Sequence, residues 1–294
     1  MKLISFDADG RSGVGIARSD GVVNLGPRIG AFGLRELLAR GLLHRAADYK
    51  EDPPDFPITS VRLLPVVPDP VHCYCVGVNY ADHLNEIRNA GVQRVQPKQP
   101  SLFIRFPETL IGANAALVIP RVSEQLDYEA ELAIVIGKGG RYIERADALS
   151  HIAGYTCFND ASVRDWQMHS SQVTPGKNFM GTGALGPWMV TADEIPDPGN
   201  LTIALRLNGK VLQGSNTSKM IFDIPAIVSY ASAMVPLKPG DVIATGTPEG
   251  VGFSRMPPIF LKAGDICEVE IERIGVLRNT VARERDVQDL LSPM

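Results

Sequence analysis

Cysteine is scarce in this sequence, with four residues in 294. Cys73 and Cys75 are two positions apart, whereas Cys157 and Cys267 stand far from them and from each other. No CxxC pair exists, so the sequence gives no sign of a zinc site. In a reducing compartment these residues are expected to be small, buried apolar side chains.

Long apolar runs and an excess of one charge are also missing. No run approaches the roughly 18–20 residues that a membrane-spanning helix needs, and the formal net charge is only −4. We therefore expect neither a membrane nor a nucleic acid as a partner. Asp7 and Asp9 stand where a signal peptide would need its apolar stretch, which predicts a cytoplasmic protein.

What the sequence does contain is an ordinary globular composition. Hydrophobic residues make up 45% and charged residues 21%, and a chain of this length can bury one large core with a small satellite. Residues 4–25 hold short apolar runs separated by the turn-forming pairs Asp9-Gly10 and Asp20-Gly21, which predicts a small β-meander. A short helix is expected over residues 34–40, ended by Gly41.

A proline-rich segment marks the expected domain boundary. Three prolines fall within residues 51–57, a density that neither a helix nor a central strand tolerates. We expect a small N-terminal β-rich domain over residues 1–65 and a larger domain over residues 66–294. The many predicted strands favour a β-rich α+β fold over alternating βαβ units. The expected strands are 71–77, 126–136, 152–158 and 201–207, the last turning at Asn208-Gly209 into a hairpin, and the expected helices are 80–90 and 224–234.

Two glutamates stand close together at the start of a predicted strand. Glu129 and Glu131 are two positions apart, so both side chains project from one face. Adjacent carboxylates repel each other, and a hard divalent cation removes that cost. Asp160 ends another predicted strand and could supply a third ligand. From the residues alone two alternatives stay open: solvated glutamates at an exposed strand end, and Asp160 as the N-cap of a helix over residues 162–169.

A histidine and a glutamate share one face of the helix predicted over residues 80–90. His83 and Glu86 are three positions apart and are therefore neighbours on the helix surface. A carboxylate beside an imidazole fixes the tautomer and raises the basicity, which suits a general base near neutral pH. The alternative is a surface pair without a role, and spacing alone favours that alternative.

Several glycine-rich loops carry a single functional side chain. Lys177 could balance anionic charge in a pocket, and the loop around Thr247 could offer backbone N–H groups to a carboxylate. Neither loop matches a phosphate-binding loop. The run Gly181-Thr-Gly-Ala-Leu-Gly matches the spacing of a dinucleotide fingerprint, but Pro187 and a predicted strand follow it where a helix is required. No nucleotide cofactor is expected.

The order and spacing of these pieces resemble the fumarylacetoacetate hydrolase family over roughly residues 70–285. Each motif is modest alone, and their shared order along the chain carries the resemblance. The main motifs are Gly77-Val-Asn-Tyr-Ala-Asp-His, Asp127-Tyr-Glu-Ala-Glu-Leu, Gly154-Tyr-Thr-Cys-Phe-Asn-Asp, Arg164-Asp-Trp-Gln, Gly176-Lys-Asn-Phe, Leu185-Gly-Pro-Trp and Thr245-Gly-Thr-Pro-Glu-Gly-Val-Gly.

The resemblance implies a mixed β-sandwich roll with the site at its mouth, a homodimer, and one Mg²⁺ that Mn²⁺ could replace. It also implies that the pair of His83 and Glu86 lies on a mobile lid. The polar stretch 91–100 that follows has little apolar content, so we expect it to be mobile when no ligand is bound. The implied roles are metal ligands at Glu129, Glu131 and Asp160, a water-activating pair at His83 and Glu86, a substrate-orienting cation at Lys177, and substrate contacts at Gln167 and Thr247.

The activity implied by the resemblance is hydrolysis of a C–C bond in acylpyruvate-type 2,4-dioxo acids, giving pyruvate and a carboxylic acid. The metal would stabilise the enolate that forms, and His83 would deprotonate the attacking water. The same site could instead decarboxylate oxaloacetate or isomerise a 2-oxo acid. A non-catalytic member that binds a metabolite is a third reading, against which the complete set of catalytic residue types argues.

Three positions depart from the pattern of the family. Val78 stands where some members have a basic residue, Arg105 where a lysine is frequent, and Met180 where many have an acidic residue. A guanidinium matches a carboxylate with two parallel hydrogen bonds. We therefore expect Arg105 either to bind a second, distal carboxylate of the substrate or to brace the lid through Glu86 or Glu108, with a solvated arginine as the alternative.

Overall fold

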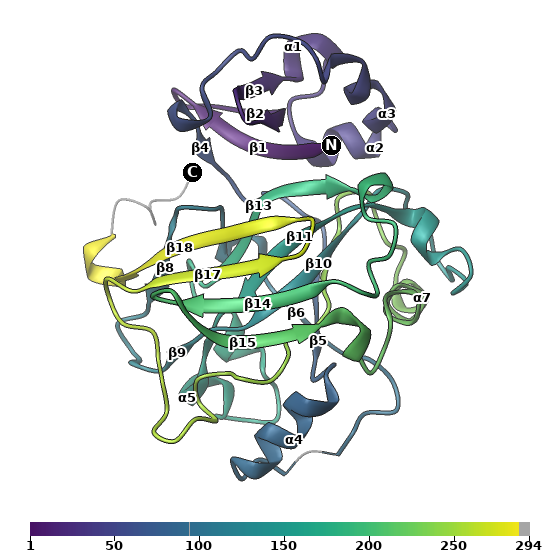
Figure 1. Cartoon of the computed structure of the whole chain (residues 1–294). Coiled ribbons are helices and arrows are strands. Elements are labelled where there is room, and N and C mark those ends of the chain that lie inside the picture. Colours follow the sequence, from purple (N-terminus) through teal and green to yellow (C-terminus); the bar gives the residue numbers. More distant parts are fainter. Residues whose placement is uncertain (94, 288–294) are drawn as a thin grey trace.

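Strands dominate the computed structural model, which describes residues 1–93 and 95–287 (Figure 1). The strands are β1 Lys2–Ala8, β2 Arg11–Arg18, β3 Gly21–Asn24, β4 Arg62–Leu63, β5 Cys73–Gly77, β6 Ser101–Ile104, β7 Leu110–Ile111, β8 Ala116–Ile119, β9 Leu126–Asp127, β10 Ala130–Ile136, β11 Ile152–Asp160, β12 Ser162–Val163, β13 Gly183–Thr191, β14 Thr202–Leu207, β15 Lys210–Asn216, β16 Val242–Ala244, β17 Ile266–Ile271 and β18 Gly275–Arg283. The α-helices are α1 Gly26–Ile29, α2 Leu34–Ala39, α3 Leu43–Ala46, α4 Ala81–Asn89, α5 Arg164–Gln167, α6 Thr174–Lys177 and α7 Ile224–Met234.

Two mixed sheets pack face to face and form the body of the molecule. In the described residues the larger sheet has the order β3-β2-β1-β13-β11-β10-β16-β5-β6, with β4 on β1 and β7 beside β13. The smaller sheet has the order β15-β14-β17-β18-β8, and β9 pairs with β12 on its own. Apolar residues from β10, β11, β14 and β17 form one cluster between the sheets. The β-rich α+β class predicted from the sequence is confirmed.

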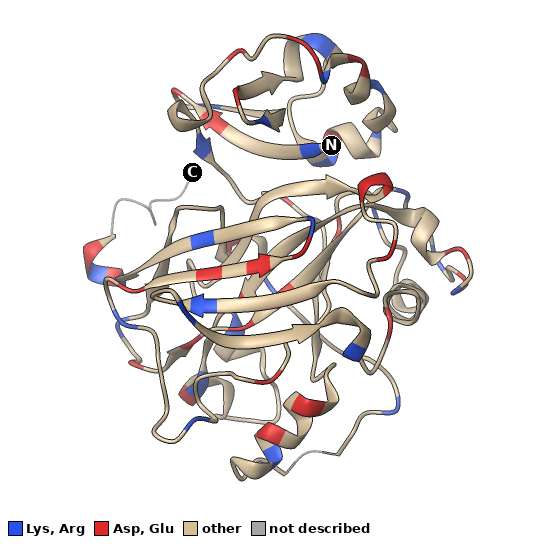
Figure 2. Ribbon diagram, viewed as in Figure 1, with Lys and Arg blue, Asp and Glu red and all other residues tan. Residues whose placement is uncertain are grey.

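The central strand β10 is buried on both faces. Leu132 and Ile134 point into the core between the sheets, whereas Ala133 and Val135 pack on the other side with residues of the N-terminal segment. A strand covered on both faces is apolar throughout rather than alternating. The smaller sheet differs, because its strands alternate buried apolar residues with outward-facing residues, among which are charges of both signs on β14, β17 and β18 (Figure 2).

The N-terminal β-meander is present and continues the larger sheet. Its first turn holds Asp9 and Gly10 at φ of 51° and 79°, the left-handed geometry of a two-residue hairpin turn. Strand β1 then pairs antiparallel with β13, with Lys2 opposite Val190. Figure 1 shows the meander and helices α1–α3 as a lobe above β13. The division into residues 1–65 and 66–294 stays a prediction.

The strand predicted over residues 126–136 is interrupted in the structure. Strand β9 ends at Asp127 and β10 begins at Ala130. Between them, the backbone N–H of Tyr128 donates to the Asp127 carboxylate at 2.8 Å and that of Glu129 donates to Asn159 Oδ1 at 3.0 Å. These side chains replace the strand partners at the break, and Glu129 lines the pocket described below.

The helix predicted over residues 162–169 is shorter than expected. Strand β12 occupies Ser162–Val163, and α5 covers only Arg164–Gln167. Its N-cap is Val163, whose side chain makes no capping hydrogen bond. The reading of Asp160 as a helix N-cap is therefore wrong.

Other predicted elements are confirmed with shifts of a few residues at their ends. Helix α4 lies within the predicted 80–90, α2 lies within 34–40, and α7 matches 224–234. The N-cap of α7 is Asp223, which accepts a hydrogen bond from the Ala226 N–H at 2.8 Å. The hairpin at Asn208-Gly209 joins β14 to β15. None of the helices in the described residues is long and apolar enough to cross a membrane.

Candidate functional site

Three carboxylates converge where β10 begins and β11 ends. The two strands pair antiparallel with Ala130 opposite Asn159, which places Glu129 and Glu131 beside Asp160. One oxygen from each carboxylate lies within 4.8 Å of the others, and all three side chains are buried. Because Glu129 and Glu131 are only 5% and 1% exposed, the alternative of solvated glutamates is wrong.

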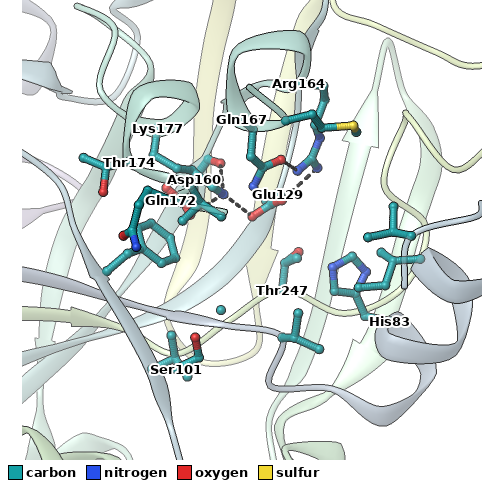
Figure 3. A pocket seen from close by; sticks show the side chains of 18 of the residues that line it. His83, Ser101, Glu129, Asp160, Arg164, Gln167, Gln172, Thr174, Lys177 and Thr247 are labelled. Carbon is teal, nitrogen blue, oxygen red and sulfur yellow. Dashed lines mark hydrogen bonds and ion pairs between the residues drawn. The ribbon is translucent and has the colours of Figure 1, made fainter. Parts of the chain in front are cut away.

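Lys177 lies directly against this cluster. Its ammonium donates to Glu129 Oε2 at 2.7 Å and to Asp160 Oδ2 at 2.6 Å (Figure 3). Burial alone would lower the pKa of Lys177, but the two carboxylates outweigh it and raise the pKa, so the side chain stays charged. Helix α6 approaches α5 closely enough that a Cβ on Gly176 would lie 2.5 Å from the Gln167 backbone. Only glycine permits this packing.

Arg164 is a second buried cation of the cluster, and it carries no role in the sequence analysis. Its Nε donates to Asp127 Oδ2 at 2.8 Å, its Nη1 donates to Gln167 Oε1 at 2.8 Å, and its Nη2 pairs with Glu129 Oε1 at 2.7 Å. Burial would raise the pKa of Glu129, but the charges of Lys177 and Arg164 overcome it and lower the pKa to about 2.

Glu131 has the opposite electrostatic environment. Burial first, and then the neighbouring carboxylates of Asp160 and Glu129, raise its pKa well above the usual range. Its Oε2 accepts one hydrogen bond from the Gly246 N–H at 2.8 Å. Ionisation of Glu131 is therefore opposed by burial and by repulsion from two other carboxylates. A divalent cation, which prefers oxygen ligands, would offset that repulsion. The residues present therefore fit such a cation.

The histidine–glutamate pair predicted from the sequence, His83 and Glu86, faces the carboxylate cluster across one pocket. His83 is 5% exposed, so it is not a surface residue, and its Nδ1 lies 3.0 Å from Glu86 Oε2. The other carboxylate oxygen of Glu86 accepts hydrogen bonds from the Gly250 N–H at 2.9 Å and the Ser254 hydroxyl at 2.7 Å. Burial would raise the pKa of Glu86, but these contacts lower it. Glu86 is thus held as an anion behind the imidazole.

The pocket has a volume of about 640 Å³ and opens beside α4. His83, the carboxylate cluster and Lys177 line it together with Gln167 and Thr247 (Figure 3). Thr247 Oγ1 accepts a hydrogen bond from Gln213 Nε2 at 2.8 Å. The structure thus brings together most of the residues singled out in the sequence. Mobility of the stretch 91–100 stays a prediction, and residue 94 within it lies outside the described residues.

Arg105 is placed differently from every expectation. The side chain is 1% exposed, so it is not a solvated arginine, and it is absent from the described residues that line the pocket. Its guanidinium donates to Asp160 and to the carbonyl oxygen of Ala161, and it reaches Thr182 Oγ1 at 3.1 Å. The structure therefore corrects the prediction that Arg105 contacts a distal carboxylate of the substrate or braces the lid. Arg105 supports Asp160 from behind.

Further side chains that sequence reasoning missed hold the cluster in place. Asn159 Oδ1 accepts from the Glu129 N–H at 3.0 Å, and Gln213 Oε1 accepts from the Ala130 N–H at 2.9 Å. Asn159 stands beside Asp160 in the motif Gly154-Tyr-Thr-Cys-Phe-Asn-Asp, so the motif could have indicated that Asn159 belongs to the site. Gln213 lies in β15, about eighty residues away, and no local pattern marks it. At the rim, Val78 has a φ of 58°, a strained conformation for a β-branched residue.

The fold and this site together define an enzyme built on a strand-rich α+β scaffold, with a buried carboxylate cluster that fits a divalent cation. The family profile "Fumarylacetoacetate (FAA) hydrolase C-terminal" matches residues 72–282. The chain belongs to this family, and the resemblance found in the motifs is confirmed.

Comparison with known proteins gives three informative relatives. A mitochondrial oxaloacetate tautomerase of Bos taurus is 45% identical over 230 residues, which are 78% of this chain and 72% of that protein. The structure of a fumarylacetoacetate hydrolase from Exiguobacterium antarcticum superposes with a TM-score of 0.80 at 35% identity, covering 96% of this chain and 99% of the other. A maleylpyruvate hydrolase from Sphingobium sp. SYK-6, solved with manganese(II) and pyruvate, has a TM-score of 0.80, 29% identity and the same coverages.

Proposed function

We propose that the protein is a hydrolase of acylpyruvate-type 2,4-dioxo acids that requires Mg²⁺ or Mn²⁺. The observation that carries the proposal is the buried carboxylate triad, which faces the His83–Glu86 pair across one pocket. A binding protein needs no ionised carboxylate behind a pocket histidine. The Sphingobium relative, with manganese(II) and pyruvate in its structure, supports both the ion and the product.

Each part of the site has a defined task in this reaction. Glu129, Glu131 and Asp160 would hold the ion. A bound Mg²⁺ or Mn²⁺ would supply a positive charge beside the carboxylate and 2-oxo oxygens of the substrate, which favours an enolate. Lys177, held between two of the carboxylates, adds a fixed cation beside the same oxygens. Gln167 and Thr247 would contact the substrate from the pocket wall.

His83 would move the proton. Because its Nδ1 faces the ionised Glu86, that nitrogen carries the hydrogen and Nε2 is left as the acceptor. Nε2 takes a proton from water, and the oxygen attacks the distal carbonyl carbon of the substrate. The C–C bond between that carbon and the pyruvyl group breaks, and its electron pair becomes the enolate of pyruvate. Protonation of the enolate releases pyruvate, and the acyl group leaves as a carboxylic acid.

A second candidate is tautomerisation of oxaloacetate, or its decarboxylation, at the same site. The 45% identity to a bovine oxaloacetate tautomerase favours this candidate. Tautomerisation moves a proton between C3 and the 2-oxo oxygen, so it needs His83 but no attacking water. Decarboxylation needs the enolate-stabilising charge alone.

One panel of assays separates these candidates. The purified protein is incubated with Mg²⁺, with Mn²⁺ or with a chelator, and is offered acylpyruvates, keto-oxaloacetate and enol-oxaloacetate. Metal-dependent release of pyruvate from an acylpyruvate, lost in His83→Ala, supports the hydrolase. Turnover of oxaloacetate tautomers without any acylpyruvate cleavage would overturn it in favour of the tautomerase. Loss of CO₂ from oxaloacetate that survives in His83→Ala indicates decarboxylation.

We further propose a homodimer located in the cytoplasm. The mitochondrial location given in the name of the bovine relative makes the compartment a point to measure. Light scattering of the purified protein reports its mass, and fractionation of the source cells reports its location. A monomeric mass would contradict the dimer.

A further inference from the structure

Residues 246–254, which follow β16 and are called the strap here, touch both halves of the candidate site. At one end the Gly246 N–H donates to Glu131 Oε2 at 2.8 Å. At the other end the Gly250 N–H and the Ser254 hydroxyl donate to Glu86 Oε1 at 2.9 and 2.7 Å. A single short segment therefore binds a carboxylate of the metal cluster and the carboxylate behind the base.

A buried aspartate fixes the strap to the rest of the cluster. Asp127 accepts hydrogen bonds from the Gly252 N–H at 2.8 Å and from the Phe253 N–H at 3.0 Å. The same carboxylate accepts from Arg164 at 2.8 Å, and Arg164 continues to Glu129 at 2.7 Å. The strap is thus connected to two of the three carboxylates in the cluster.

The path of the strap leaves little room for movement. Gly250 has a φ of 101°, and a Cβ there would lie 2.2 Å from the carbonyl oxygen of Leu212. A Cβ on Gly252 would lie 1.8 Å from the carbonyl oxygen of Ile259. Backbone packed this closely at Gly250 and Gly252 is a rigid support, and Ser254 follows two residues later in the chain.

The hydroxyl of Ser254 has one proton and two acceptors in reach. Glu86 Oε1 lies at 2.7 Å and the carbonyl oxygen of Val251 at 2.9 Å. The shorter contact leads to a carboxylate, and hydrogen bonds to ionised acceptors are the stronger ones. In the described residues, the hydrogen bonds of the Glu86 side chain come from His83, Gly250 and Ser254. Ser254 is therefore the side chain that orients Glu86 from the side opposite the imidazole.

We propose that Ser254 is a positioning residue for the base. Through Glu86 it sets the orientation of His83, and the strap sets that orientation relative to the carboxylate cluster. The inference rests on the proposed function, because it assumes that His83 moves a proton in the reaction. Its physical basis is that a base misplaced by a fraction of an ångström loses much of its advantage while substrate binding is unchanged.

Kinetics of two substitutions test the role. Ser254→Ala should lower kcat by roughly 10-fold, the effect of one hydrogen bond to a charged group, and leave KM within about two-fold. Ser254→Thr keeps the hydroxyl and should restore kcat to within about three-fold of the wild type. Equal losses in both variants, or a loss confined to KM, would overturn the proposal.

A double-mutant cycle tests whether Ser254 acts through Glu86. In a Glu86→Ala background, Ser254→Ala should cause less than about a two-fold further loss, because the carboxylate that it orients is gone. A matched control is Ser123→Ala. This substitution also removes a serine–carboxylate hydrogen bond of 2.7 Å, but the carboxylate is that of Asp165, which does not contact His83 or Glu86. The control should keep kcat within about two-fold. Full additivity in the cycle would refute the inference.

A spectroscopic measurement separates this inference from the proposed function. With Mg²⁺ present, the ¹⁵N shifts of His83 report which ring nitrogen carries the hydrogen. Ser254→Ala should mix the two tautomers, whereas Ser254→Thr should keep the hydrogen on Nδ1. Failure of the wild type to turn over any 2-oxo acid would refute the proposed function, and the tautomer result would still decide the role of Ser254. Unchanged tautomer populations in Ser254→Ala would overturn it.

Discussion

Replacing Arg105 by lysine is the sharpest test of how the metal cluster is supported. The guanidinium spans three acceptors: the Asp160 carboxylate, the carbonyl oxygen of Ala161, and Thr182 Oγ1 at 3.1 Å. A lysine keeps the charge but has one small ammonium on a flexible stem. It can reach the carboxylate or the other acceptors, but it cannot hold all three in one plane.

The size of the effect follows from the burial of this ion pair. Arg105 and Asp160 are both within 1% of complete burial, so water cannot replace the lost contacts. Removing a hydrogen bond to a charged group costs about 1.5–3 kcal/mol. We expect Arg105→Lys to lower the free energy of unfolding by about 2–4 kcal/mol. This is less than the largest cost, about 5 kcal/mol, of removing one partner of a buried ion pair, because the lysine keeps the charge. Because Arg105 holds Asp160, which is a proposed metal ligand, the substitution should weaken divalent-ion binding about 10- to 100-fold.

Two measurements check this prediction. Calorimetric titration with Mn²⁺ gives the affinity, and urea unfolding in the presence of a chelator gives the stability without the ion. Arg145→Lys is the matched control, since Arg145 pairs with Asp223 at 2.9 Å on an exposed surface, and neither quantity should change there. Unchanged Mn²⁺ affinity in Arg105→Lys, with a loss of activity confined to substrates bearing a second carboxylate, would contradict the supporting role and restore a substrate contact.

Three further predictions concern the cluster, the base and the thiols. Glu131→Gln should abolish the rise in thermal midpoint that Mg²⁺ gives the wild type, and undiminished Mg²⁺ binding by calorimetry would remove Glu131 from the ligand set. His83→Ala should lower kcat for hydrolysis by roughly 10²–10⁴-fold while circular dichroism stays unchanged, and normal hydrolysis would place the base elsewhere. Burial raises the pKa of Cys157 and Cys267 to about 12, and all four cysteines are buried. A thiol reagent at neutral pH should therefore react with none of the four in the native protein and with all four after denaturation, and rapid labelling of the native protein would contradict the burial.

Local patterns along the chain predict the elements whose conformation depends on local chemistry. The hairpin turns at Asp9-Gly10 and Asn208-Gly209 follow from residues that accept positive φ. Helix α7 follows from its apolar pattern and its capped start. The break in the strand before Ala130 could not be predicted in this way, because it depends on Asn159, which comes from another strand. A partner that is distant in sequence leaves no mark on the local period.

The candidate site shows the same division. The two-residue spacing of Glu129 and Glu131 predicts one shared face on a continuous strand. In the structure β10 begins only at Ala130, and the pairing of β10 with β11 is what places both glutamates beside Asp160. Arg105 could not be placed from its type, because arginines are rarely buried unless they are paired. Its partner is a carboxylate 55 positions away. Local spacing and motifs therefore indicate the candidate ligands and Lys177, whereas the buried contacts of Arg105 and Arg164 with the carboxylates become visible only in the tertiary structure.

The charge of the cluster also predicts an order of binding. Four buried carboxylates, those of Asp127, Glu129, Glu131 and Asp160, are set against the three buried cations Lys177, Arg164 and Arg105. The formal excess is one negative charge when all are ionised and zero when Glu131 is protonated, as its raised pKa favours without an ion. In neither state does the cluster attract an anionic 2-oxo acid. A divalent ion reverses the excess to one positive charge, which complements a monoanion. We expect pyruvate to bind measurably in calorimetry only after Mg²⁺ or Mn²⁺ is added. Equal affinity for pyruvate in the presence of a chelator would show that the fixed cations are sufficient, and the carboxylate triad would then need another explanation.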